Sequence, residues 1–156
     1  MTDMWLDPRE EEIVKRHQQI YPVKVGALAR DLGLTVREVD MSDEISGSLR
    51  SEEGKWVIRV NRRHAKVRQR FTVAHEIAHY LLHRDRIGLG LTDDTFYRST
   101  QSDSVEREAN RLAADILMPW HLVHKATAHG TRDPEALSQA FEVSEAAMSI
   151  RLGLPA

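Results

Sequence analysis

Two histidines and a glutamate occur together in a segment with helical spacing, and this arrangement constrains the fold more than any other feature. The segment runs from residue 62 to 83 and contains His-Glu-Ile-Ala-His at positions 75 to 79. On a helix, residues four apart project only about 40° from one another, so His75 and His79 share one face. Glu76 lies about 100° round from His75, beside that face. Apolar residues cover the rest of the helix, which predicts that it packs inside the protein.

Two imidazoles and a carboxylate at this spacing match the needs of a hydrolytic zinc centre. Such a centre uses neutral nitrogen ligands, a general base and a position open to water. His75 and His79 are the predicted ligands, and Glu76 is the predicted general base. A chance pattern on a solvated helix is the alternative, but buried imidazoles beside a carboxylate need partners, and a metal is a natural one. The chain has no Cys, so any third ligand must be His, Asp or Glu.

A second helical segment, residues 104 to 118, is the best source of that third ligand. It carries an apolar stripe whose alanines allow close approach to the first helix. Glu106 lies about 65° from the centre of the stripe and Glu108 about 95° away on the other flank. This geometry favours Glu106 as the ligand and Glu108 as a solvated or ion-paired residue. Asn110, one turn after Glu106, is a candidate acceptor for a ligand imidazole, and an ordinary hydrogen bond between helices explains it equally well.

The remaining histidines of interest are weaker candidates for the site. His83, one turn beyond His79, lies near the metal face, where it is a candidate for supporting the site. A structural hydrogen bond to the following loop is the more expected role for it. His64, His121 and His124 would take part only if the fold brings them to the metal, so surface positions are expected for them.

The patterns outside these two segments predict an α+β domain with short helices at its start. The first helix is expected over residues 8–20 with Asp7 as its N-cap, and the second over residues 25–32 before Gly33. Alternating polar and apolar residues predict a small three-stranded antiparallel sheet. Its strands are expected at 35–39, 45–50 and 55–61.

The second half of the chain predicts a loop and a pair of terminal helices. Residues 85–103 are rich in Gly, Thr, Ser and Asp and are expected to form a surface loop. Helical patterns at 134–141 and 144–152 resemble a helix-turn-helix pair. We therefore expect a metal-binding domain over residues 1–130 and a helical extension over residues 131–156 packed on it.

Composition and charge exclude several classes of protein. Hydrophobic residues make up 41% and charged residues 29% of the 156, which is typical of a soluble globular chain. No stretch approaches the ~18 apolar residues of a membrane span, and the first twenty residues lack a signal-peptide core, so a cytoplasmic protein is expected. The net charge of −2 argues against a domain that coats nucleic acid. The second terminal helix carries one Arg and no Lys, a poor set for DNA, so direct nucleic-acid binding is not expected.

Two stretches of the sequence resemble the ImmA/IrrE-type zinc metallopeptidases. The first is residues 68–83, around His-Glu-Ile-Ala-His, and the second is residues 106–119, which begin at the glutamate and end in Leu-Met-Pro. Shorter matches are Ile-Ser-Gly at 45–47, Ile-x-Val-Asn at 58–61 and the terminal pattern from Phe141 to Leu152. The resemblance covers about residues 20 to 155.

The resemblance implies a zincin-like fold and a particular chemistry. It implies zinc held by His75, His79 and Glu106, with Glu76 as the general base. Members of this family characteristically cleave a helix-turn-helix (XRE-type) repressor encoded beside them, which releases stress, phage or mobile-element genes, and others belong to toxin–antitoxin pairs. The implied function is a zinc-dependent endopeptidase that cleaves such a repressor or antitoxin. The alternative is a regulator that binds DNA or its repressor with weak or no proteolysis, and the intact metal and base residues disfavour it.

Overall fold

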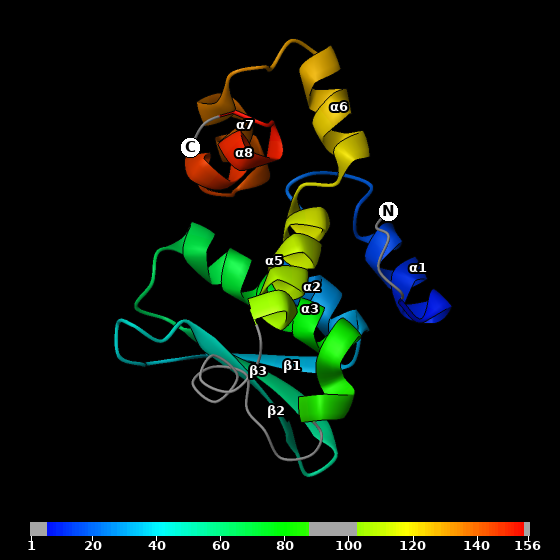
Figure 1. Cartoon of the computed structure of the whole chain (residues 1–156), viewed down its shortest axis with the longest axis vertical. Helices are drawn as coiled ribbons and strands as arrows, with labels where there is room; N and C mark the ends of the chain where they lie inside the picture. Colours follow the sequence, from blue (N-terminus) through cyan, green and yellow to red (C-terminus); the bar gives the residue numbers. More distant parts are fainter. Residues whose placement is uncertain (1–5, 88–102, 155–156) are drawn as a thin grey trace.

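The computed structural model describes residues 6–87 and 103–154 and has a small sheet, a long helix across it and further helices beyond (Figure 1). The helices are α1 (Pro8–Arg16), α2 (Val25–Asp31), α3 (Lys66–Ile87), α5 (Asp103–Leu117), α6 (Trp120–Ala128), α7 (Pro134–Phe141) and α8 (Glu145–Arg151). The strands are β1 (Leu34–Val39), β2 (Gly47–Glu52) and β3 (Lys55–Asn61). α3 packs on β2 and β3, α5 packs on α3, and α6 to α8 lie farthest from the sheet. The predicted α+β class is confirmed.

The sheet has the order β1-β3-β2, and the prediction that it is antiparallel throughout is wrong. β2 and β3 form an antiparallel hairpin across Glu53 and Gly54, which both adopt positive φ, as a tight hairpin turn requires. β1 instead runs parallel to β3, with Leu34 opposite Trp56. The chain reverses direction after β1 and again after β2, and β3 inserts between the two earlier strands. Two reversals leave β3 parallel to β1. The alternation of polar and apolar residues along a strand does not determine which strand lies in the middle of the sheet.

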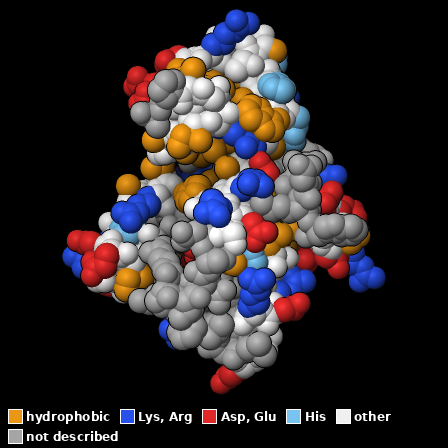
Figure 2. Space-filling model, in the orientation of Figure 1, with side chains coloured by type: hydrophobic (Ala, Val, Ile, Leu, Met, Phe, Trp, Pro, Cys, Tyr) orange, Lys and Arg blue, Asp and Glu red, His pale blue; other side chains and the backbone are white. Residues whose placement is uncertain are grey.

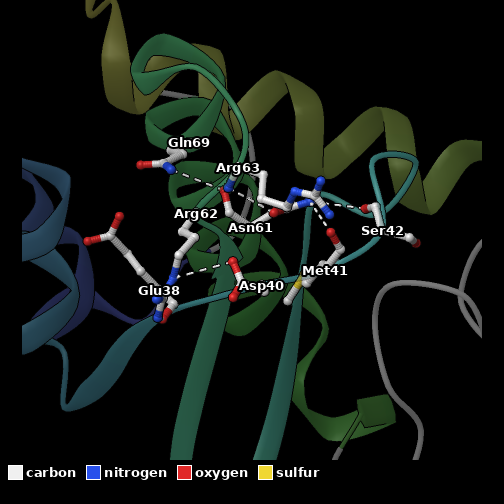
Figure 3. A network of polar contacts seen from close by, with 8 residues as sticks. All are labelled: Glu38, Asp40, Met41, Ser42, Asn61, Arg62, Arg63 and Gln69. Carbon is white, nitrogen blue, oxygen red and sulfur yellow. Dashed lines mark hydrogen bonds and ion pairs between the residues drawn. The ribbon is translucent and has the colours of Figure 1, made fainter.

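Asn61 fixes the connection between the sheet and α3 (Figure 3). Its side chain is fully buried, and its Nδ2 donates hydrogen bonds to the carbonyl oxygens of Ser42 at 3.0 Å and Ile45 at 2.8 Å. Its Oδ1 accepts a hydrogen bond from the Arg63 backbone N–H at 3.0 Å. One amide therefore satisfies the backbone of the loop before β2 and of the turn before α3. This turn delays the helix, which begins at Lys66 and not at residue 62 as the spacing predicts.

Helix boundaries elsewhere follow local capping and side-chain contacts. Asp7 caps α1 as predicted, accepting a hydrogen bond from the Arg9 N–H at 2.8 Å. α1 ends at Arg16, four residues earlier than expected, because the next residues turn toward other helices. Gln18, for example, donates from Nε2 to the Asp115 carbonyl oxygen on α5 at 2.8 Å. α6 has no counterpart in the prediction, since Pro119 indicated only the end of a helix, and it in fact also occupies the N-cap position of the next helix.

The two C-terminal helices form where the sequence predicts them, and contacts from both sides join them to the rest of the chain. α7 matches its predicted range, and Ser144 caps α8 by accepting a hydrogen bond from the Ala147 N–H at 3.0 Å. The Tyr21 and Phe141 rings stack with centroids 4.4 Å apart, and Arg151 pairs with Asp115 at 2.8 Å. The proposed boundary at residue 130 stays a prediction.

The predicted surface loop falls mostly outside the described residues. α3 continues to Ile87, so the start of the expected 85–103 loop is helical. Within the parts of the chain that the structure describes, no helix is both long and apolar enough to cross a bilayer.

Candidate metal centre

The central helix α3 buries its polar motif between the sheet and α5. His79 is fully buried, and the exposed fractions of Glu76 and His75 are 2% and 8%. Four alanines on the facing sides of α3 and α5 are each fully buried, which lets the two helices approach closely. These are Ala74, Ala78, Ala109 and Ala113. The close approach brings Glu106 on α5 to the imidazoles on α3.

The three predicted ligands converge on one point. One potential ligand atom from each of His75, His79 and Glu106 lies within 4.8 Å of the other two. His75 Nε2 is 3.2 Å from Glu106 Oε2, and His79 Nε2 is 3.5 Å from Glu106 Oε1. The two imidazole rings meet edge to face, with centroids 4.6 Å apart. Both Nε2 atoms therefore face the same carboxylate.

Asn110 sets the protonation of the His75 ring. Its Oδ1 lies 2.9 Å from His75 Nδ1. An amide oxygen only accepts hydrogen bonds, so Nδ1 carries the proton and donates it. In neutral His75, the lone pair is then on Nε2, the atom that faces Glu106. Asn110 thus occupies the place that the sequence predicts for an acceptor behind a ligand imidazole.

A chain of two further residues sets the protonation of His79. Glu108 Oε1 lies 3.1 Å from His83 Nε2, so His83 donates from Nε2 and its Nδ1 carries a lone pair. His79 Nδ1 lies 3.0 Å from that His83 Nδ1 and must be the donor between them. The lone pair of neutral His79 is then also on Nε2. Burial lowers the pKa of His83 against the opposing hydrogen bond to Glu108, which keeps this ring neutral at neutral pH.

The charge of Glu106 completes a site that needs a cation. Burial tends to raise the pKa of Glu106, but hydrogen bonds and positive charge from the His75 and His79 rings, when these also carry protons on Nε2, outweigh burial and hold the pKa well below the usual range. Glu106 is therefore a carboxylate at neutral pH. Two imidazole lone pairs and a carboxylate facing one point repel one another unless a cation lies between them, either a metal ion or protons on the rings. The donor set of two neutral nitrogens and one carboxylate fits zinc.

Glu76 lines a pocket beside these three residues. The pocket has a volume of about 360 Å³, and both His75 and Glu106 also line it. Ser46, from the loop before β2, and Thr72, one turn earlier on α3, form part of its wall. Glu76 therefore lies in the same pocket as two of the three potential metal ligands.

The other histidines with candidate roles lie away from the three ligands. His64 Nε2 is 2.8 Å from the Asp43 carbonyl oxygen, and His121 Nε2 is 2.7 Å from that of Gln18. The His124 ring contacts Trp120 on the same helix. Sequence reasoning correctly separated these three from the site. It missed the pairing of His83 with Glu108, and it expected His83 to bond the following loop. The continued four-residue spacing from His75 through His79 to His83 could have indicated the contact of His83 with His79, but not the one with Glu108.

Comparisons with known proteins give matches to a family profile and to solved structures. The sequence profile of the Peptidase_M78 family, described as the IrrE N-terminal-like domain, matches residues 29–153. A solved structure described as a Mycobacterium tuberculosis transcriptional regulator superposes with a TM-score of 0.65 at 21% identity, over 94% of this chain and 46% of that one. The chain thus spans about half the length of that regulator, and the likeness shows a shared fold. A search of the curated proteins finds no match. The family match covers most of the chain and confirms the resemblance seen in its motifs: the chain belongs to the IrrE N-terminal-like, or ImmA/IrrE, peptidase family.

Proposed function

We propose that this protein is a zinc-dependent endopeptidase. The observation that carries the proposal is the convergence of His75, His79 and Glu106, with both imidazoles held in the tautomer that presents Nε2 to the metal. Such a site supplies three protein ligands and leaves further positions for water and substrate, as catalytic zinc sites do.

Each residue of the site has a distinct part in peptide hydrolysis. His75, His79 and Glu106 would hold a zinc ion, which would act as a Lewis acid on the scissile carbonyl and lower the pKa of a water molecule. Glu76 accepts the proton of the attacking water on its carboxylate and passes it to the nitrogen of the leaving amine. Because Glu76 is only 2% exposed, bulk water competes little for that proton.

The proposed substrate is a helix-turn-helix repressor or antitoxin. Family membership supports this choice, since the ImmA/IrrE resemblance implies cleavage of such proteins. Cleavage would release the repressed stress, phage or mobile-element genes. Both partners are proposed to meet in the cytoplasm.

A DNA-binding regulator is the second candidate, because α7 and α8 resemble a helix-turn-helix pair. The arrangement of α8 disfavours it. Arg151 is its single basic residue, and the guanidinium is engaged with Asp115 and with the Met118 carbonyl oxygen. A recognition helix needs free basic and amide groups for phosphates and base edges.

Metal analysis and one conservative substitution test the proposed enzyme. The purified protein is expected to bind about one zinc ion per chain. Glu76→Gln is expected to keep the zinc and to lose cleavage of a co-expressed helix-turn-helix repressor encoded by the neighbouring gene, since the amide cannot accept the proton. Glu135→Gln, the same chemical change at an exposed position on α7, is the matched control and should cleave like the wild type.

Two results would contradict the proposal. A protein that binds no zinc at neutral pH would rule out the metal centre. A Glu76→Gln variant that cleaves as fast as the wild type would exclude Glu76 as the general base. Salt-dependent binding of duplex DNA by the wild type, without any proteolysis, would favour the regulator instead.

A further inference from the structure

An apolar groove adjoins the metal site, and we propose that it binds the part of the substrate polypeptide next to the cleaved bond. The bound segment is expected to combine apolar side chains with at least one Asp or Glu. This inference rests on the proposed peptidase function and adds a substrate preference to it.

The groove lies between α3, α5 and the C-terminal helices. Its volume is about 810 Å³, which is in the range of pockets that hold ligands of several residues or rings. Apolar residues from all of these elements line it, among them Val67, Phe71, Ala114, Trp120, Ala146 and Ile150. Figure 2 shows apolar side chains gathered in the hollow between α8 and the helices below it, with basic side chains beside them.

The groove adjoins the pocket that His75 and Glu106 line. Arg68, Phe71 and Asn110 line both of them. The Phe71 ring stacks toward His75, with ring centroids 6.4 Å apart, and Asn110 bonds the same imidazole. A polypeptide whose scissile bond lies at the metal must extend over the neighbouring surface, because each residue of an extended chain spans about 3.3 Å. The groove is the adjoining surface with an apolar lining.

The rim of the groove exposes large apolar side chains to water. Ile150 is 66% exposed, Trp120 45% and Val67 37%. Scattered exposed apolar residues are ordinary, but a cluster around a concave surface is typical of a binding site. Burial of these side chains by a partner removes apolar area from water and stabilises the complex.

The charges of the groove select the occupant. Three arginines line it, Arg68, Arg111 and Arg151, and no Asp or Glu does. Arg151 is held by Asp115 and stacks on the Trp120 ring with its guanidinium 4.5 Å from the centroid. Within the described part of the chain, Arg68 and Arg111 form no ion pair. Two exposed guanidinium groups beside an apolar surface complement a peptide that carries carboxylates among apolar residues.

Cleavage of a randomised peptide library by the zinc-loaded protein tests the proposal. The probe is a set of twelve-residue synthetic peptides, and the cleaved sequences are aligned at the cut bond. The wild type is expected to favour apolar residues together with Asp or Glu on one side of that bond. Arg111→Glu is expected to lower kcat/KM for the acidic peptides by about tenfold, because like charges then face each other. Lys125→Glu, an equal charge reversal at an exposed α6 residue outside the groove, should leave kcat/KM unchanged.

A second variant is designed to fill the groove. Ala146 is exposed, so Ala146→Trp can be accommodated without disturbing the core, and the thermal unfolding midpoint should confirm this. The indole occupies space needed by the peptide. KM for the preferred peptide is expected to rise about tenfold with kcat nearly unchanged, the pattern of lost uniform binding. The zinc content should equal that of the wild type.

The outcomes separate the groove from the peptidase function. Cleavage without an acidic or apolar preference, equal in the wild type and both groove variants, would overturn the groove and leave the peptidase standing. A zinc-loaded wild type that cleaves neither the library nor a repressor would overturn both. A dimer that Ala146→Trp dissociates, or duplex DNA binding that Arg111→Glu abolishes, would assign the groove to a second copy or to nucleic acid and overturn the proposed occupant.

Discussion

His83 acts on the metal site through His79. Its Nδ1 accepts a hydrogen bond from His79 Nδ1–H, and its own Nε2–H donates a hydrogen bond to Glu108 Oε1. Without an acceptor at this place, the buried His79 ring has no fixed tautomer and its Nδ1–H loses a hydrogen bond, which costs about 1–3 kcal/mol. His83 and Glu108 are therefore positioning residues for the potential ligand His79, and neither belongs to the cluster of His75, His79 and Glu106.

We predict that His83→Leu weakens zinc binding by about 10–100-fold, the usual effect of removing the partner of a ligand imidazole. His83→Asn is expected to lose less, because the Asn Oδ1 takes roughly the place of the imidazole Nδ1 and still accepts from His79. Competition with a chromophoric chelator at fixed pH measures the affinity. His124→Leu, at an exposed position on α6, is the control. Equal affinities for His83→Leu and the wild type would show that His79 needs no such partner.

Asn61 gives a second prediction at the level of one side chain. Asn61→Asp keeps the shape but places a carboxylate oxygen against the Ser42 and Ile45 carbonyl oxygens, which have lost their donor. The free energy of unfolding is expected to fall by about 3 kcal/mol or more, since a buried charge adds to the lost hydrogen bonds. Urea denaturation measures this. Asn61→Ala should lower the free energy of unfolding less than the isosteric Asn61→Asp does. The reverse order would show that the volume of the side chain matters more here than its amide donor.

The individual site residues were largely accessible from the sequence. Four-residue spacing on one helix pointed to His75 and His79, and the flank of an apolar stripe pointed to Glu106 over Glu108. The contact of Glu108 with His83 depends on how far α5 is displaced along α3. That displacement is set by the packing of the two helices and not by the spacing within either of them, so the sequence alone does not fix it.

At the level of elements, the position of β2 against α3 depends on Gly47. A Cβ atom added there would lie 2.5 Å from the Arg59 carbonyl oxygen and 2.7 Å from the Thr72 methyl carbon. Both distances are well below van der Waals contact. Only glycine allows β2 to lie this close to β3 and to the helix that carries the metal ligands, and Ser46 beside it lines the metal pocket.

We predict that Gly47→Ala destabilises the fold by about 1–3 kcal/mol, the usual cost of overpacking a close contact. Adding Thr72→Ser removes the methyl group and should recover part of this loss, because one of the two close contacts disappears. Gly26→Ala is the control: its added Cβ meets only the Arg30 side chain at 3.7 Å, within a helix, so it should be neutral or stabilising. Thermal and urea unfolding of the four proteins measure the differences. No loss in Gly47→Ala would mean that β2 can move away from α3.

Helices and strands were predicted correctly where signals within their own segment determine them. They were missed or misplaced where tertiary contacts determine them. The ranges of β3 and α7 follow from alternation, turn residues and caps within the segments themselves. The parallel pairing of β1 with β3 depends on which strand occupies the middle of the sheet, and the end of α1 depends on contacts of Gln18 with α5. α6 was missed because proline both ends one helix and begins another.

At the scale of the whole molecule, Arg70 ties three distant segments together. Its guanidinium donates hydrogen bonds to the carbonyl oxygens of Val23 at 2.8 Å, Phe141 at 3.2 Å and Glu142 at 3.0 Å. Val23 lies between α1 and α2, Phe141 is the last residue of α7, and Glu142 follows it. Because Arg70 lies about one and a half turns before His75 on α3, the same helix that carries the potential metal ligands also fixes the C-terminal pair. These contacts favour a chain that unfolds as one cooperative unit.

The expected effect of Arg70→Met follows from those contacts. Methionine fills part of the volume but leaves three carbonyl oxygens without the guanidinium, so the free energy of unfolding should fall by about 2–4 kcal/mol. The free energy of unfolding of Arg70→Lys is expected to lie between those of the wild type and Arg70→Met. An ammonium group cannot span three carbonyl groups as the planar guanidinium does. Lys66→Met is the control: the Lys66 side chain is 80% exposed and pairs with Glu142 at 3.6 Å, an interaction of little energetic weight.

Urea unfolding followed by far-ultraviolet circular dichroism, together with hydrogen exchange of residues 134–151, measures the outcome. One transition shared by all segments is expected in every variant. Two separate transitions in the wild type would show that α7 and α8 fold independently, and an unchanged midpoint in Arg70→Met would show that packing of Phe141 alone holds them in place.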